Sequence, residues 1–322
     1  MRTKIMRQLS IFTALDRDGS TPRRGQPLEC FDIFCGAGGF SEGARQAGHE
    51  VVFACDSDAN AIATHKRNHP SAVHMQLELP AEIPFPVDGR PFHVHGSPPC
   101  QQFSTMNTLG RTMERKGNSI SLIEWYLELA LNSGATSWSM EQVSSGGVRR
   151  IVEQIRMKYP GKMAWAVFKL EELGVPQTRK RLIAGSPHII AKLLQLQAKT
   201  NKRSVADVLD VGRATHIRNA KAWISTRLQF DNERTYELFT GRAPHTACTK
   251  RVTLPSPTVL TSCYLRWVWW EDGTPMYKHL TVAECMVLQT FPPDYKFPSK
   301  PVLAKKQIGN ALPPLVAKLW MS

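Results

Sequence analysis

The sequence predicts an α/β protein in which a mainly parallel sheet, with helices on both faces, is joined to a smaller basic lobe. Three observations support this fold class. Short apolar segments alternate with amphipathic helical patterns between residues 28 and 186. The alternation stops at residues 187–250, which are rich in arginine and lysine, and apolar segments return at residues 251–322. Strands that alternate with helices are typical of a parallel sheet whose two faces are covered.

Six apolar segments of the first region are expected to form strands. Each is short and bounded by turn residues: 28–34, 51–56, 92–97, 136–143, 163–170 and 180–186. Two helices are predicted between them, because apolar side chains recur there at helical spacing. The first stripe is Ile120, Ile123, Leu127 and Ala130, and the second is Val148, Ile151, Val152, Ile155 and Tyr159. Further helices are expected from about Ser41 and over residues 280–291.

These patterns divide the chain into four parts. Residues 1–27 are expected to form a basic N-terminal extension, and residues 28–186 the main domain. Residues 187–250 are expected to form a separate binding lobe, and residues 251–322 to return to the main domain.

The charge of the chain indicates a polyanionic partner. Its 322 residues include 41 lysines and arginines against 27 acidic residues, which gives a net charge of +14. Residues 187–251 hold twelve of the basic and five of the acidic residues, so half of the surplus lies there. Nucleic acid is the expected partner of a protein this basic.

The cysteines and the apolar segments argue against a metal site, a disulfide framework and a membrane span. The seven cysteines are scattered and form no CxxC pair, although such pairs are typical of zinc and redox sites. No apolar stretch reaches the roughly 20 residues that a membrane span needs, and the N-terminus lacks the apolar middle of a secretory signal. We therefore expect an intracellular monomer that uses neither metal nor membrane.

A glycine-rich turn predicts a ligand at the end of the first strand. In "FDIFCGAGGF" Gly36, Gly38 and Gly39 follow the strand, and Asp56 lies twenty residues beyond Gly36, at the end of the next strand. An acidic side chain there can reach ribose hydroxyls. Because Ser41 replaces the third glycine of the dinucleotide fingerprint, the turn suits an adenosyl ligand without a pyrophosphate at least as well as a dinucleotide. A simple tight turn is the alternative.

A second turn predicts a rigidly presented thiol. "GSPPCQQFS" ends another strand with two prolines immediately before Cys100, and two fixed φ angles make a stiff turn. Such a mount suits a nucleophile, whose thiolate form positive neighbours would favour. A packed, unreactive thiol is the alternative interpretation.

Two further strands carry polar groups, one at its end and one at its beginning. Glu141 lies among apolar neighbours in "SMEQV", and Arg179 and Arg181 alternate in "GVPQTRKRLIAGS", so both arginines point to one face. A carboxyl group for proton transfer and two guanidiniums for an anion or a carbonyl oxygen are the functional interpretations. A solvated strand end and surface arginines are the alternatives.

Six segments, in this order, resemble the C5-cytosine methyltransferase family. They are "DIFCGAGGFSEG", "GSPPCQQFS", "MEQV", "GVPQTRKR", "LTVAECMVLQTFPPDY" and "QIGNALPP". The resemblance extends from residue 28 to the end of the chain. It implies a Rossmann-like S-adenosylmethionine-dependent methyltransferase fold and a DNA (cytosine-5)-methyltransferase of the stand-alone, sequence-specific, restriction-modification type. Residues 28–186 then become the catalytic cofactor-binding domain and residues 187–250 the target-recognition lobe.

The resemblance also implies where S-adenosylmethionine binds. The glycine turn would surround its methionine part, Asp56 would hold the ribose, and the "IGNALPP" segment would complete the pocket. The implied cofactor residues are Phe34, Gly36, Ala37, Gly38, Gly39, Asp56, Ser57, Glu78, Pro99 and Asn310.

The family's chemistry assigns a role to each catalytic candidate. Cys100 would add to C6 of the cytosine, which lets C5 attack the methyl group. Glu141 would hydrogen-bond or protonate N3, and Arg181, helped by Arg179, would hold O2. The base must first be flipped out of the duplex. The family has asparagine after the glutamate, and the longer Gln142 is expected to shift the hydrogen bonds that support the Pro–Cys turn, with activity reduced or retained.

Double-stranded DNA is the substrate that the resemblance implies. The basic lobe is expected to read a short site in the major groove, and the loop after Cys100 to close over the flipped base. The implied DNA-binding residues are Gln101, Ser104, Arg111, Arg115, Lys116, Arg213, Arg218 and Arg227. The tryptophans of "YLRWVWWEDG" are expected to pack in a core, although stacking on bases is an alternative.

Three other interpretations stay open. The same reaction could act on a tRNA cytosine, or the chain could be a catalytically weak relative that binds DNA or a partner methyltransferase. A nicotinamide-dependent enzyme is the third, and the incomplete glycine fingerprint argues against it.

Overall fold

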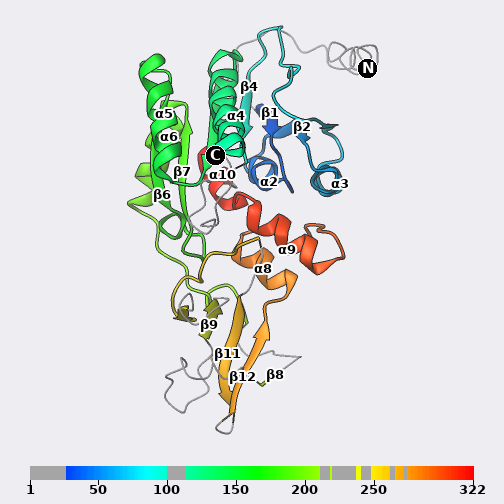
Figure 1. Cartoon of the computed structure of the whole chain (residues 1–322), viewed down its shortest axis with the longest axis vertical. Coiled ribbons are helices and arrows are strands. Elements are labelled where there is room, and N and C mark those ends of the chain that lie inside the picture. Colours follow the sequence, from blue (N-terminus) through cyan, green and yellow to red (C-terminus); the bar gives the residue numbers. More distant parts are fainter. Residues whose placement is uncertain are drawn as a thin grey trace.

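A computed structural model of the chain describes residues 27–99, 113–210, 218–219, 237–240, 248–261, 265–271 and 274–322. Within these ranges the chain forms a large sheet covered by helices and a smaller sheet at the other end of the molecule (Figure 1). Residues 1–26, which include most of the expected N-terminal extension, lie outside the described ranges.

The large sheet has the strand order β3-β2-β1-β4-β5-β7-β6. Its strands are β1 (Glu29–Ile33), β2 (Glu50–Asp56), β3 (Val73–Gln76), β4 (Phe92–Gly96), β5 (Ser137–Gln142), β6 (Ala164–Lys169) and β7 (Lys180–Gly185). Neighbouring strands are parallel except β7, which is antiparallel to β5 and β6. The predicted mainly parallel sheet is confirmed. β3 was not predicted, because apolar and polar residues alternate there over only four positions.

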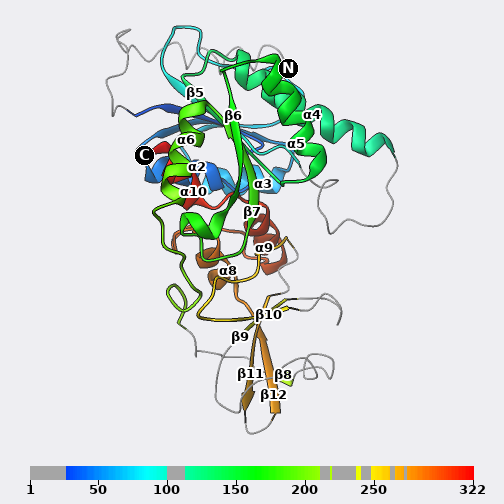
Figure 2. The ribbon, with the colours of Figure 1, turned by 90° about the vertical axis from the view of Figure 1, so that its left-hand side faces the viewer.

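Helices cover both faces of this sheet, as predicted (Figures 1 and 2). The helices α4 (Met113–Asn132) and α5 (Gly146–Lys158) pack on one face, and α2 (Gly39–Gln46), α6 (Pro187–Gln197) and α10 (Pro314–Met321) pack on the other. α3 (Ala59–Asn68) lies against β2 and β3, and the short 3-10 helix η1 (Leu170–Leu173) joins β6 to the turn before β7.

The predicted apolar stripes account for α4 and α5. Ile123, Leu127 and Ala130 of the first stripe are buried, and the second stripe buries Val148, Ile151, Val152 and Ile155. α5 begins where the side chain of Ser145 accepts a hydrogen bond from the backbone N–H of Val148, which satisfies one free donor of the first turn.

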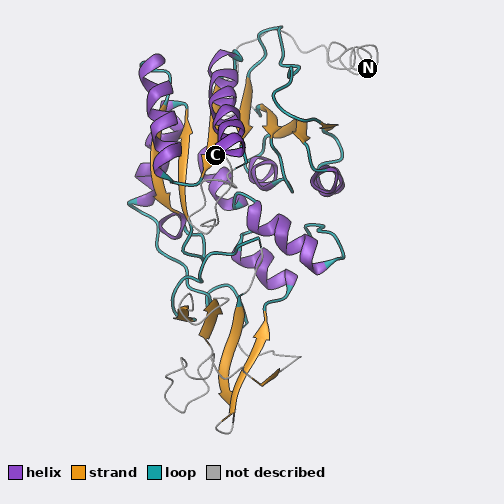
Figure 3. Cartoon of the chain, viewed as in Figure 1, coloured by secondary structure: helices purple, strands orange, loops and turns teal. Residues whose placement is uncertain are grey.

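A smaller antiparallel sheet forms the far end of the molecule (Figure 3). Its order is β10-β9-β11-β12-β8, with β8 (Arg218–Asn219), β9 (Glu237–Thr240), β10 (Cys248–Arg251), β11 (Arg266–Glu271) and β12 (Thr274–His279). Trp267 and Trp269 on β11 are buried in a core with Leu280, Phe291 and Tyr295. The expected core packing of these two tryptophans is confirmed.

Two helices connect the sheets. α8 (Val282–Leu288) begins with a capping box, in which Thr281 and Glu284 satisfy each other's backbone N–H groups. α9 (Pro301–Asn310) lies beside it and leads into α10. The helix expected over residues 280–291 is therefore shorter than predicted.

The structure divides the chain differently from the expected boundaries at residues 187 and 250. α6 belongs to the large unit, because Ile189, Ile190 and Leu193 are buried against its sheet. β11 and β12 complete the small sheet, although they follow residue 250. The expected boundaries were placed where the density of charged residues changes along the chain. Charge density does not show which sheet an apolar helix or strand packs against, so the boundaries in the structure differ.

Among the described residues, no helix is long and apolar enough to cross a membrane. Within the same residues, no group of three histidine, cysteine or acidic side chains is arranged to hold a metal ion.

A substitution at Gly43 can test the close packing of α2 against α10. A Cβ at Gly43 would lie 2.3 Å from the carbonyl oxygen of Pro314 and 2.5 Å from the Cβ of Ala317. We expect Gly43→Ala to lower the free energy of unfolding by about 1 to 3 kcal/mol, because the two helices must separate. Gly146→Ala is the control, since a Cβ there meets no atom within 4 Å. Urea unfolding measures both, and equal effects would contradict the assigned contact.

Candidate active site

A cavity of about 960 Å³ lies at the carboxyl ends of β1, β2, β4 and β5. Ligands of parallel sheets bind at this edge. The cavity brings together these predicted residues: Phe34, Gly36, Ala37, Gly39, Asp56, Ser57, Glu78, Pro99, Glu141, Arg179, Arg181 and Asn310. Gly38 is the one predicted cofactor residue that is not in its wall.

Several predicted residues cannot be placed in the site. Cys100, Gln101, Ser104, Arg111, Arg213 and Arg227 lie outside the described residues. Arg115 and Lys116 belong to the first turns of α4, and Arg218 to β8, where only the backbone is described. Their roles stay predictions.

Each glycine of the first turn has its own reason to be a glycine. Gly36 has a φ of 52°, and a Cβ there would meet no atom within 4 Å, so its backbone faces open space. Gly38 has a φ of 90° and packs under Tyr295, whose hydroxyl would lie 2.5 Å from an added Cβ. At Gly39 an added Cβ would lie 2.1 Å from the carbonyl oxygen of Leu312. The turn therefore serves both the cavity and the packing of the C-terminal segment.

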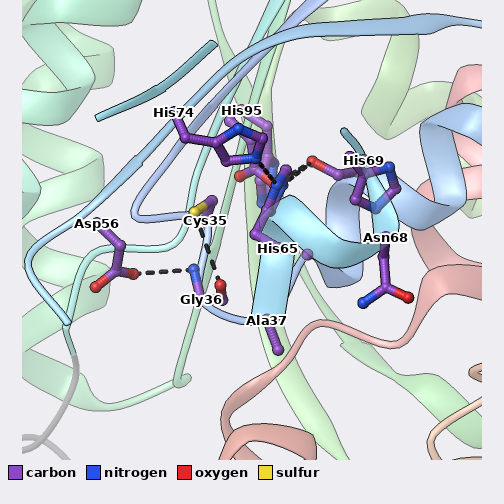
Figure 4. Close-up of polar contacts among 12 residues, drawn as sticks. Cys35, Gly36, Ala37, Asp56, His65, Asn68, His69, His74 and His95 are labelled. Atoms are coloured by element: carbon purple, nitrogen blue, oxygen red, sulfur yellow. Dashed lines mark hydrogen bonds and ion pairs between the residues drawn. The ribbon is translucent and has the colours of Figure 1, made fainter. Parts of the chain in front are cut away.

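Asp56 is held at the cavity wall by two backbone groups. Its Oδ2 accepts a hydrogen bond from the N–H of Gly36 at 2.9 Å (Figure 4), and its Oδ1 accepts one from Asp58 at 2.9 Å. Burial raises the pKa of Asp56, and these two N–H groups oppose that rise. A carboxylate fixed in this way can accept further hydrogen bonds from a ligand's hydroxyl groups.

Beneath the turn lies a buried polar cluster that the sequence analysis did not identify. Ser41 donates a hydrogen bond to Asp32 Oδ2 at 2.6 Å, and its Oγ lies 2.9 Å from Nε2 of His65. Nδ1 of His65 lies 2.8 Å from Nε2 of His74 (Figure 4). Burial lowers the pKa of His65 to about 3 and that of His74 to about 4. The only signal in the sequence was the polar Asp32 between Phe31 and Ile33.

The second predicted turn follows β4 directly. Ser97, Pro98 and Pro99 line the cavity, and Cys100 is the next residue along the chain. Gln142 donates a hydrogen bond from Nε2 to the carbonyl oxygen of Pro98 at 2.9 Å. Its Oε1 accepts the N–H of Val143 at 2.7 Å. The amide of Gln142, despite its longer stem, thus reaches the turn that precedes Cys100.

Glu141 and Arg181 form a close ion pair in the cavity wall. Nε of Arg181 lies 2.7 Å from Oε1 of Glu141, and the carboxyl-bearing side chain is 7% exposed. Nη1 of Arg181 also donates to the carbonyl oxygen of Lys180 at 2.8 Å. The two predicted side chains therefore meet, and each also faces the cavity.

Arg179 has contacts that the sequence analysis did not foresee. It is 2% exposed, and its guanidinium donates hydrogen bonds to the carbonyl oxygens of Gly309 at 3.2 Å, Ala311 at 3.3 Å and Val259 at 3.3 Å. It therefore binds the C-terminal segment to the strand side of the cavity. These carbonyl oxygens already occupy much of the guanidinium. Its expected help in holding a base stays a prediction.

Comparison with known proteins gives a consistent result. A model of the family described as C-5 cytosine-specific DNA methylase matches residues 28–131 and 151–321. The chain is 28% identical over 305 residues to the type II methyltransferase M.HgiDI of Herpetosiphon aurantiacus, covering 89% of this chain and 90% of that protein. It is 26% identical over 324 residues to the type II methyltransferase M1.HphI of Haemophilus parahaemolyticus, covering 90% and 85%.

A solved structure supports the fold alone. The Dnmt2 methyltransferase of S. pombe superposes with a TM-score of 0.62 at 14% identity, covering 91% of this chain and 96% of that chain.

Because the histidines of the buried polar cluster are held in their neutral form, we expect the free energy of unfolding to fall in acid. Burial lowers the pKa of His65 to about 3 in the folded chain, whereas a histidine in an unfolded chain titrates near 6.5. As the pH falls below 6.5 the unfolded state takes up a proton that the folded state does not, so stability is lost between pH 6.5 and about 3.

We expect His65→Gln to remove one histidine's share of this loss. Between pH 7.5 and 5.0 the variant should lose about 2 kcal/mol less unfolding free energy than the wild type. Urea unfolding at the two pH values measures the difference. Equal losses in the two proteins would show that His65 is not buried in its neutral form.

Proposed function

Because this chain belongs to the C-5 cytosine-specific DNA methylase family and is a DNA cytosine-5 methyltransferase, we propose that it transfers the methyl group of S-adenosylmethionine to C5 of a cytosine flipped out of duplex DNA. The observation that carries the proposal is the single cavity that contains Asp56, Glu141, Arg181 and the turn before Cys100. Groups far apart in the sequence there surround one space large enough for a nucleoside-sized ligand and a base.

The residues of the cavity fit S-adenosylmethionine. The open backbone at Gly36 leaves room for a ligand, and the fixed carboxylate of Asp56 suits ribose hydroxyls. Asp32, Asp58 and Glu78 also line the cavity, and acidic side chains suit a cationic ligand. Such a ligand supplies a methyl group on a positively charged sulfur. The exposed Asn310 at the end of α9 completes the wall.

Cys100 is the proposed nucleophile. C5 of cytosine is a weak nucleophile, so a thiolate first adds to C6, and the resulting enamine can attack the methyl group. Loss of the C5 proton to water then expels the thiolate. Rigid presentation of the thiol favours this addition, because a near-attack geometry removes part of the entropic barrier. The two prolines and the Gln142 hydrogen bond to Pro98 support such a presentation.

Glu141 and Arg181 would act on the opposite edge of the base. Glu141 would hydrogen-bond or protonate N3, which draws electron density away from C6. Arg181 would hold O2 and stabilise the charge that develops on the ring. Their ion pair at 2.7 Å would hold both groups ready at one place in the wall. We propose Arg179 for a different task, the attachment of the C-terminal wall.

Extrusion of the base costs a few kcal/mol, and phosphate contacts would offset it. The net charge of +14 supplies the necessary cations. We propose that the small sheet, with Arg218 on β8 and the segments between its strands, carries the sequence specificity.

A methyl-transfer assay tests the proposed function. Labelled S-adenosylmethionine is offered with unmethylated duplex DNA, hemimethylated duplex DNA and tRNA, and the label is located by base analysis. We expect 5-methylcytosine in DNA from the wild type and none from Cys100→Ala. DNA with 5-fluorocytosine at the target should trap a covalent adduct that Cys100→Ala does not form. Label in tRNA alone, or binding of DNA without transfer, would overturn the proposal.

The hydrogen bond from the Gln142 amide to Pro98 leads to a further prediction. Gln142→Asn keeps the amide on a stem one methylene shorter, which in this backbone no longer reaches the carbonyl oxygen of Pro98. We expect the single-turnover rate of methyl transfer to fall about tenfold, as for the loss of one hydrogen bond. Gln142→Leu, which removes the amide but keeps the volume, should fall at least as far. A rate unchanged by Gln142→Asn would show that this contact does not limit the reaction.

A further inference from the structure

Two neighbouring strands of the large sheet carry histidine and serine where a buried strand is normally apolar. His93 and His95 alternate on β4, and Ser137 and Ser139 lie opposite them on β5, in the register His93↔Ser137 and His95↔Ser139. Both histidines and Ser139 are fully buried. Burying polar groups is costly unless they are hydrogen-bonded, so this pattern requires a network of partners.

The partners form one continuous chain that ends at Ser97. Nδ1 of His93 lies 2.7 Å from Ser137 Oγ, and its Nε2 lies 2.9 Å from Ser139 Oγ. The same hydroxyl lies 2.9 Å from Nδ1 of His95, whose Nε2 lies 3.1 Å from Ser97 Oγ. We name Ser137, His93, Ser139, His95 and Ser97 the histidine–serine ladder.

The ladder has few arrangements of its protons. Burial lowers the pKa of His95 to about 4 and that of His93 well below its ordinary value, so both rings are neutral near pH 7. A neutral imidazole donates through one nitrogen and accepts at the other, and a serine hydroxyl has one proton to donate. The hydrogen bonds of the ladder can therefore all run in one direction, or both rings can donate to Ser139, and in either case each of the four ring nitrogens has a partner.

The ring of His95 is also fixed by packing. It stacks on Phe40 with a centroid distance of 4.2 Å and an interplanar angle of 16°, and Trp320 lies 5.8 Å away. Because the ring cannot turn freely, the position of its Nε2 is set by the core of the sheet. Through its contact with this nitrogen, Ser97, the first residue of the turn, is held in place as well.

Ser97 begins the turn that leads to Cys100. Its backbone N–H donates to the carbonyl oxygen of Ile33 at 3.3 Å, and the next peptide is held by Gln142 through Pro98. Both Ser97 and His95 line the cavity. On the basis of the proposed function, we propose that His95 is a positioning residue for methyl transfer, which acts through Ser97 to fix the Ser97–Pro99 turn that presents Cys100.

The expected effect follows from the geometry. Without the bond from His95 the hydroxyl of Ser97 loses its buried partner, and one of the contacts that hold the turn is gone. A displacement of about 1 Å at a reacting group can cost about a hundredfold in rate. The contacts of Ile33 and Gln142 remain, so we expect His95→Phe to lower the rate of methyl transfer by about ten- to a hundredfold.

The experiment compares two substitutions of the same kind, two residues apart on one strand. His95→Phe removes both hydrogen bonds but keeps a ring against Phe40. His93→Phe is the matched control, since His93 is equally buried, also stacks on Phe40 and has two serine partners, but does not contact Ser97. Ser97→Ala removes the hydrogen bond between His95 and Ser97 by deleting the hydroxyl at the half-buried end of the ladder.

Two measurements are made on each variant. The first is the single-turnover rate of methyl transfer at saturating S-adenosylmethionine and DNA. The second is amide hydrogen exchange in the peptide that covers residues 92–99, measured without cofactor or DNA, which does not depend on activity. Thermal unfolding identifies any variant that does not fold, and Ser97→Ala then still tests the link.

We expect His95→Phe and Ser97→Ala to lose rate similarly, the double variant to lose little more than either, and His93→Phe to lose less than about threefold. Exchange of the Ser97 amide, the one exchangeable amide of the Ser97–Pro99 turn, should accelerate in the first two variants alone. Equal rates for His95→Phe and His93→Phe, or an additive double variant, would overturn the proposal. If the wild type transfers no methyl group while exchange responds as expected, the proposed function fails and the structural link stands.

Discussion

The site depends on one attachment, the one between the last segment of the chain and its first glycine turn. Arg179 is the centre of this attachment, because its buried guanidinium binds the carbonyl oxygens of Gly309, Ala311 and Val259. Hydrogen bonds from a charged donor are the stronger kind, and a buried charge that loses its partners is strongly destabilising. The backbone of Gly39 and Gly43 then allows Leu312 and α10 to approach closely. Without this attachment the cavity would lack its C-terminal wall.

The polar groups of the core share a second constraint. Asp32 and the histidines of the ladder are buried in the large sheet, and His65 is buried on α3 beside it, where most side chains are apolar. They are tolerated because the ring nitrogens of His65, His93 and His95 all lie within hydrogen-bond distance of a neighbouring side chain. Satisfied networks of this kind specify one arrangement of the side chains. Here that arrangement lies directly below the two turns that form the proposed site.

The candidate site could be predicted in its parts but not in its connections. The glycine turn and the Pro–Pro turn each follow a strand, and Asp56 and Glu141 each lie near the end of one. The carboxyl ends of parallel strands meet at one edge of a sheet. The pair of Glu141 with Arg181 and the carbonyl partners of Arg179 join segments separated by 40 to 132 residues. No local pattern encodes such a partner, because it depends on which strands become neighbours. The histidines of β4 were missed for the same reason, since their serine partners lie on another strand.

The sequence by itself determined the fold class, six of the seven strands of the large sheet, and the family, because apolar periodicity and short motifs are local properties. The tertiary structure decided where the units end and which groups touch. It placed α6 with the large sheet and β11 and β12 with the small one, and it turned Gln142 toward Pro98. The physical reason is that burial and hydrogen bonding are satisfied between segments distant along the chain, so the partner of each buried group becomes known only when the sheets have formed.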